Sequence, residues 1–160
     1  MRLHLPTAEH TDRIAALFAS VRPARAIVHL RGDLGAGKST FARAMLRALG
    51  VQGAIRSPTY TLVERYPLHD GSDALHLDLY RIGDPGELEF LGIDAGEGAL
   101  WLVEWPERGG AHLPPADLDV AMAIDGAGRS LDAVAGSPVG DEWLALVAGS
   151  TDLAAFVPPR

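Results

Sequence analysis

The sequence contains no cysteine, only one lysine and no long apolar run. Without cysteine the chain can form neither a disulfide nor a thiolate metal site, so we expect a cytoplasmic protein. No apolar stretch approaches the roughly 20 residues of a membrane-spanning helix. The first residues are also too polar for a signal peptide, so we expect no membrane association. The six histidines fall at no metal-ligand spacing and are interpreted as ordinary surface or core residues.

Basic residues are scarce as well, because 14 basic side chains face 21 acidic ones and the formal net charge is −7. A protein that grips RNA or DNA alone normally presents a basic face to the phosphates. We therefore expect no tight, direct binding to nucleic acid. The single lysine is Lys38, in a chain that otherwise uses arginine. This indicates a position where a compact ammonium is required and a larger, forked guanidinium does not serve.

The remaining composition predicts one globular domain, since 48% of the 160 residues are hydrophobic and 22% are charged. Apolar spacing and turn residues indicate alternating helices and strands, and hence a single-domain α/β fold with a mixed central sheet flanked by helices. We place the domain at 1–150, including a C-terminal hairpin and helix at about 116–149, and a tail at 151–160. The expected helices are 8–21, 40–49 (with Gly50 as C-cap), 85–91 and 143–147, and the expected strands are 2–5, 26–30, 57–66, 74–79, 99–103, 118–124 and 131–134.

The most specific motif is the segment Gly32–Ser39, which matches the phosphate-loop pattern G-x4-G-K-[ST] at every fixed position. A β-rich run precedes it and an amphipathic helix follows, as in a P-loop nucleoside triphosphatase. Its glycines let main-chain amides surround the phosphates, Lys38 reaches the β- and γ-phosphates, and Ser39 places its hydroxyl on magnesium. We expect ATP and Mg²⁺ to bind here. The loop residues assigned to the nucleotide are Asp33, Leu34, Gly35, Ala36, Gly37, Lys38 and Ser39.

Two acidic residues follow apolar strands, and a P-loop enzyme needs a carboxylate for its metal. Asp78 lies in an alternating strand, and Glu104 directly follows the apolar run 100–103. Ligands of open α/β sheets bind beyond the carboxyl ends of the strands, so both acids are candidates for the metal site beside Ser39. The same two acids and Lys38 are the candidate catalytic residues. The alternative for Asp78 is a surface acid on a strand.

A third element is the hydroxyl-rich segment Ser57–Thr61, which follows the P-loop helix. Such a segment can sense the γ-phosphate as switch loops do. The residues themselves leave an ordinary turn equally open.

Several motifs in this order resemble one bacterial family. Gly-Asp-Leu-Gly-Ala-Gly-Lys-Ser-Thr, Ser-Pro-Thr-Tyr-Thr-Leu-Val, His-Leu-Asp-Leu-Tyr-Arg, Glu-Leu-Glu-x-Leu-Gly and Val-Glu-Trp-Pro-Glu together resemble the TsaE (formerly YjeE) family. The resemblance covers about residues 5 to 150. It implies a small α/β ATPase that acts with TsaB and TsaD in tRNA threonylcarbamoyladenosine biosynthesis, meets tRNA only through that complex, and does not bind DNA.

The resemblance also implies roles for single residues. It places Thr40 in the phosphate loop, Thr59 in the switch segment, and Trp105 beside the site; for Trp105 a packed turn remains an equal alternative. It assigns Asp78 to the magnesium and Glu104 to hydrolysis. The chain departs from the family at Ser39, where threonine is commoner, and at Phe90, where an acidic residue is common.

Two other functions are compatible with a P-loop. A small-molecule kinase usually carries a lid with several arginines, and the sequence shows no such cluster. A guanine-nucleotide switch usually carries [NT]-K-x-D, which the single lysine excludes. Because no arginine finger is identifiable, we expect slow hydrolysis by the isolated chain.

Overall fold

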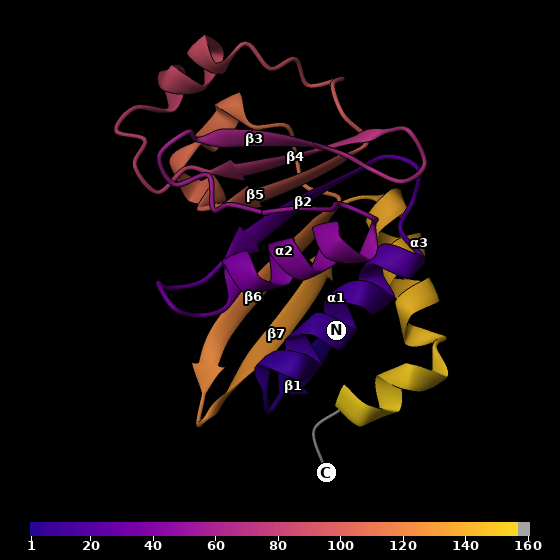
Figure 1. Ribbon diagram of the computed structural model, residues 1–160. Helices are drawn as coiled ribbons and strands as arrows, with labels where there is room; N and C mark the ends of the chain where they lie inside the picture. Colours follow the sequence, from indigo (N-terminus) through magenta and orange to yellow (C-terminus); the bar gives the residue numbers. More distant parts are fainter. Residues whose placement is uncertain (157–160) are drawn as a thin grey trace.

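The computed structural model describes residues 1–156, which form one seven-stranded sheet with helices packed on it (Figure 1). The strands are β1 (Arg2–Leu5), β2 (Ala26–Arg31), β3 (Val63–Pro67), β4 (Asp73–Asp78), β5 (Leu100–Glu104), β6 (Leu118–Asp125) and β7 (Gly128–Ala135). The helices are α1 (Ala8–Ser20), α2 (Lys38–Ala48) and α3 (Pro138–Ala148), with 3₁₀ helices η1 (Pro85–Leu91), η2 (Pro106–Arg108), η3 (Gly110–His112) and η4 (Thr151–Phe156).

The strand order is β1-β7-β6-β2-β5-β4-β3. Strands β4, β5, β2 and β6 run parallel in the centre, and β3 and β7 lie antiparallel to them on either side. Strand β1 pairs antiparallel with β7 at the edge. The central strands therefore end at the same edge of the sheet, where β2 leads into the glycine-rich loop. The mixed sheet confirms the predicted fold class.

The two faces of the sheet are covered differently. Helices α1 and α2 lie side by side across one face (Figure 1) and enclose the larger apolar core with α3. The Trp143 indole of α3 donates a hydrogen bond to the carbonyl of Phe18 in α1 at 2.9 Å, which joins the two helices. The opposite face carries a smaller apolar cluster, in which Leu88 of η1 and Leu113 pack against β4 and β5.

Local signals explain where three of the helices begin. Thr7 caps α1 by accepting from the amide of His10, and Asp84 forms a capping box with Glu87 at the start of η1. Ser137 and Pro138 begin α3 in the same way, five residues before the predicted start at Trp143. Within residues 1–156 no helix combines the length and the apolar character needed to cross a bilayer.

Several predictions about elements are corrected. The strand expected at 57–66 begins only at Val63, because a turn closed by the Leu62–Pro58 hydrogen bond precedes it. Helix α2 begins at Lys38, two residues before the predicted start, and its C-cap is Leu49, with Gly50 one residue beyond at φ 93°. The segment 151–160 was expected to be a tail. Instead, Thr151–Phe156 forms η4, and Phe156 is buried against α1, with the His10 ring edge-on at 5.9 Å. The last four residues, 157–160, lie outside the described part of the chain.

Candidate nucleotide-binding site

The phosphate loop connects β2 to α2 and depends on three glycines with positive φ. Gly32, Gly35 and Gly37 have φ values of 138°, 78° and 106°. Gly37 is the N-cap of α2 and supplies no side chain there, while the first helical bond runs from Phe41 to its carbonyl. By helix geometry the amides just after Gly37 have no intrahelical acceptor, so they and the helix dipole form a site for an anion.

The ammonium of Lys38 lies at the centre of this loop. It donates hydrogen bonds to the carbonyls of Gly32 at 2.6 Å and Asp33 at 2.9 Å, and it lies 4.5 Å from the centre of the Trp105 ring. Burial lowers the pKa of Lys38 below its ordinary value, and the carboxylates of Glu104 and Asp78 oppose that shift. Nearby negative charge therefore favours the charged form of this buried group.

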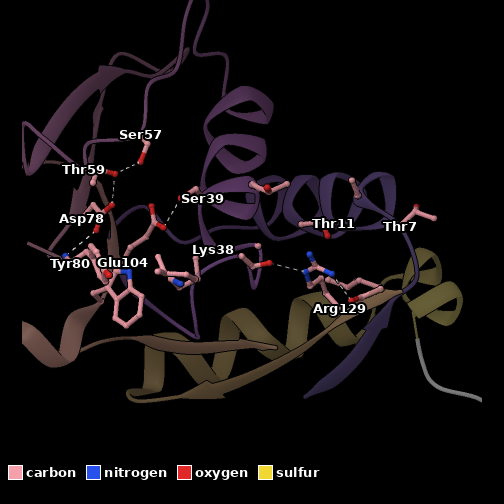
Figure 2. Close-up of a pocket in the computed structure, with 18 of the residues that line it drawn as sticks. Thr7, Thr11, Lys38, Ser39, Ser57, Thr59, Asp78, Tyr80, Glu104 and Arg129 are labelled. Atoms are coloured by element: carbon pink, nitrogen blue, oxygen red, sulfur yellow. Dashed lines mark hydrogen bonds between the residues drawn. The ribbon is translucent and has the colours of Figure 1, made fainter. Parts of the chain in front are cut away.

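Asp78 and Glu104 are brought together by the sheet. They are the last residues of the adjacent parallel strands β4 and β5 and are direct partners in the register. Both side chains are buried. Glu104 Oε1 accepts a hydrogen bond from the Ser39 hydroxyl at 2.7 Å, so the acid is linked to the first turn of α2 (Figure 2). The prediction that both acids converge on the loop agrees with this geometry.

The hydroxyl-rich segment Ser57–Thr61 contacts Asp78 at the end of β4. The Thr59 hydroxyl donates to Asp78 Oδ2 at 2.9 Å, and the Ser57 hydroxyl lies 2.9 Å from that of Thr59 (Figure 2). The turn closes with a bond from the Leu62 amide to the Pro58 carbonyl, and Leu62 has the unusual φ of 66°. A non-glycine residue in this conformation is held there by its surroundings. Thr59 is thus docked on the acid, whereas Tyr60 of the same segment is 82% exposed.

These side chains surround one cavity of about 530 Å³. Ten of the predicted residues line it: Leu34, Gly35, Gly37, Lys38, Ser39, Thr40, Thr59, Asp78, Glu104 and Trp105. The other two do not. Ala36 is fully buried, and Asp33 takes part through its carbonyl, which accepts from Lys38.

Sequence reasoning missed several residues of this site. His76 was interpreted as an ordinary residue, yet its Nε2 lies 2.7 Å from Glu104 Oε2. The available signal was its position two residues before Asp78 in one strand, which places both side chains on the same face. Arg129 of β7 also lines the cavity and donates to the Gly35 carbonyl at 3.2 Å. No local signal pointed to Arg129, because only the sheet order brings β7 near the loop.

The donor set suits magnesium better than a softer metal. Among residues 1–156 no group of three His, Asp or Glu side chains is placed to hold a metal ion. What converges is the Ser39 hydroxyl and the carboxylates of Asp78 and Glu104, all hard oxygen donors. Mg²⁺ typically takes one or two protein carboxylates and completes its shell with water and substrate phosphates.

The chain is similar to known proteins of one family. The family model for "Threonylcarbamoyl adenosine biosynthesis protein TsaE" matches residues 5–131. The tRNA threonylcarbamoyladenosine biosynthesis protein TsaE of Haemophilus influenzae is 42% identical over 131 residues, covering 80% of this chain and 82% of that protein. The Aquifex aeolicus protein of the same name is 43% identical over 106 residues, covering 65% and 75%. The crystal structure of Bacillus subtilis YdiB superposes with a TM-score of 0.73 at 26% identity, covering 92% and 93%.

Proposed function

The chain belongs to the TsaE family of tRNA threonylcarbamoyladenosine biosynthesis, and from this premise we propose that it is the ATP-hydrolysing subunit of that machinery. In this proposal it binds ATP with Mg²⁺, acts in the cytoplasm with TsaB and TsaD, and meets tRNA only through them. The net charge of −7 supports an indirect role toward tRNA. The observation that carries the proposal is the convergence of Lys38, Ser39, Asp78 and Glu104 on one cavity beneath a phosphate loop.

Lys38 and the loop amides would hold the phosphates. The Lys38 ammonium is at present bonded to two loop carbonyls, and it would exchange them for β- and γ-phosphate oxygens. Hydrogen bonds to a charged partner are stronger than bonds to a neutral carbonyl, so this exchange favours the bound state. The amides at the start of α2 add neutral donors that need no counter-ion.

Ser39 and Asp78 would hold the magnesium, with Glu104 beside them. When bound, the ion neutralises charge that develops on the phosphates. Asp78 already has both oxygens engaged, since Oδ1 accepts from the Tyr80 amide at 3.0 Å and Oδ2 accepts from Thr59. Its carboxylate is therefore fixed in direction, and Thr59 is placed to respond to a change at the metal site.

Glu104 would orient the attacking water. Its carboxylate is buried at the end of β5, and Oε1 lies within hydrogen-bond distance of Ser39 at the cavity. A buried acid at the γ-phosphate end can accept a hydrogen bond from water and align it for in-line attack.

The other end of the cavity would take the nucleoside. It is lined by Thr7 and Thr11 near the start of α1 and by Arg129 beside the hairpin turn. Figure 2 shows Lys38 between the acids on one side and Arg129 on the other. With the γ-phosphate near Glu104, the sugar and base fall toward α1 and Arg129.

The test is phosphate release from Mg–ATP and Mg–GTP, measured with and without TsaB and TsaD. We expect the free chain to turn over ATP at roughly 10⁻⁴ to 10⁻² per second, the range of P-loop enzymes without an arginine finger, and to accelerate with its partners. Lys38→Ala should abolish nucleotide binding. Glu104→Ala should keep binding and lose turnover.

Three outcomes contradict the proposal. Turnover of tens per second by the free chain rules out a partner-dependent subunit. A preference for GTP, or phosphoryl transfer to a small acceptor, favours the guanine-nucleotide switch or the kinase. Hydrolysis by Glu104→Ala at the wild-type rate removes Glu104 from the mechanism.

A further inference from the structure

His76 and Glu104 form a buried pair across two neighbouring strands. His76 lies in β4 with 0% of its surface exposed, and Glu104 in β5 is 2% exposed. The His76 Nε2 atom is 2.7 Å from Glu104 Oε2, while Oε1 of the same carboxylate accepts from Ser39. The two oxygens are therefore held separately, one by the sheet and one by the phosphate-loop helix.

The hydrogen-bond partners of the His76 ring indicate which of its two nitrogens carries the hydrogen. The oxygens of a carboxylate accept hydrogen bonds, so the ring donates from Nε2–H. The other nitrogen, Nδ1, is buried and has no hydrogen-bond partner in the described structure. If Nδ1 carried the proton, a buried donor would lack an acceptor, and two lone pairs would face each other across 2.7 Å. Both faults cost free energy, so the Nε2–H tautomer is the one that fits.

We propose that His76 is a positioning residue for Glu104, which fixes Oε2 so that Oε1 is the oxygen presented to Ser39, the metal and the attacking water. This inference rests on the proposed ATPase function. A glutamate side chain has three rotatable bonds, and a carboxylate held at one oxygen can still turn. With Oε2 anchored by the buried ring of His76, the acid keeps one orientation when Ser39 turns toward the metal.

A pair of substitutions separates the hydrogen bond from the packing. His76→Leu fills the space with an apolar side chain and removes the donor. His76→Gln keeps a donor, because its amide nitrogen is the same number of bonds from Cα as Nε2 of histidine. His29→Leu is the matched control, because His29 is also a buried histidine in a strand. Its neighbours Val28 and Leu30 face the core under α1 and α2, so the His29 side chain lies on the other face of the sheet.

The experiment measures the dissociation constant of Mg–ATP, single-turnover hydrolysis and thermal unfolding for the wild type and these variants, with Glu104→Gln as reference. We expect His76→Leu to bind Mg–ATP as the wild type does and to hydrolyse it ~10–100-fold more slowly, the usual loss when a second residue no longer orients a functional carboxylate. His76→Gln should recover most of the rate. His29→Leu should keep the wild-type rate.

The inference is overturned if His76→Leu hydrolyses ATP at the wild-type rate. It is also overturned if His76→Gln and His76→Leu are both folded and hydrolyse ATP equally slowly. If His76→Leu does not fold, ¹⁵N NMR of the His76 ring in the wild type decides: the Nε2–H tautomer supports the inference and the Nδ1–H tautomer overturns it. A wild type that neither binds nor hydrolyses ATP, while its NMR shows the Nε2–H tautomer, contradicts the proposed function and not the hydrogen bond.

Discussion

Gly32 and Gly35 both take a positive φ in the phosphate loop, but their surroundings differ. A Cβ atom on Gly32 would lie 2.2 Å from the carbonyl oxygen of Met122 in β6, whereas a Cβ on Gly35 would meet nothing within 4 Å. Alanine at Gly35 brings only backbone strain, about 1 kcal/mol. Alanine at Gly32 adds a displacement of the neighbouring strand, for a loss of about 3 kcal/mol.

Urea unfolding of Gly32→Ala and Gly35→Ala without nucleotide checks this prediction, and Gly35→Ala serves as the control for strain alone. Equal losses in the two variants would mean that the contact with β6 does not determine the choice of glycine at position 32.

The residues of the site were predictable to the extent that local pattern defines them. The P-loop motif places Lys38 and Ser39, and the rule that ligands bind beyond parallel strand ends places Asp78 and Glu104. His76 was missed because its position two residues before Asp78 places it on the same face as that acid but does not distinguish a partner of the site from a packed core residue. Its role depends on a side-chain contact across two strands, which the sequence does not encode locally.

At the scale of elements, η4 packs against His10 and Arg13 of α1, although the sequence predicted a tail. Phe156 is 1% exposed and Arg13 lies over its ring at 5.4 Å, whereas Phe90 on η1 is 88% exposed. Replacing a buried phenylalanine with alanine costs about 3–5 kcal/mol, and an exposed one usually less than about 0.5 kcal/mol. We therefore expect Phe156→Ala to lower the free energy of unfolding strongly and Phe90→Ala to leave it unchanged.

Thermal and urea unfolding of the two phenylalanine variants measure the difference. Nucleotide affinity of folded Phe156→Ala should equal that of the wild type, because Phe156 does not line the cavity. If Phe156→Ala is as stable as Phe90→Ala, η4 does not contribute to the core.

Strands and helices with strong periodicity and caps were predicted to within a few residues, as α1 with its Thr7 cap shows. The ends were less accurate. Lys38 and Ser39 belong to the first turn of α2. The sequence pattern assigns them to the phosphate loop, so the helix was predicted to begin two residues too late. In η4, the short 3₁₀ segment has no apolar period, and only its burial against α1 makes it part of the domain.

At the scale of the whole molecule, the mixed sheet was predicted, but the strand order was not. The order places β6 next to β2 and so brings Arg129 of the hairpin beside the phosphate loop. Pairing between segments about 90 residues apart depends on long-range packing, for which the sequence offers no local signal. The end of the cavity lined by Thr7, Thr11 and Arg129 is a product of this topology.

The pH dependence of stability is a property of the whole molecule, and His29 gives it a predictable direction. Burial lowers the pKa of His29 below its ordinary 6.5; the Asp119 carboxylate opposes the shift and the Arg31 guanidinium adds to it. Below pH 6.5 the unfolded chain therefore binds a proton that the folded chain does not. Stability then falls as the pH drops through this value, and the His29 contribution to the slope ends once the folded form also binds the proton.

His29→Gln cannot take up this proton, so the difference in unfolding free energy between wild type and variant isolates the contribution of His29 from that of all other groups. We expect the wild type to lose more stability than His29→Gln between about pH 7 and pH 5. Above pH 7 the difference should be constant and should report only the packing change. Urea unfolding at each pH gives both quantities. Parallel curves over the whole range would show that His29 takes up its proton equally readily in the folded and unfolded states, and would contradict the lowered pKa of this buried side chain.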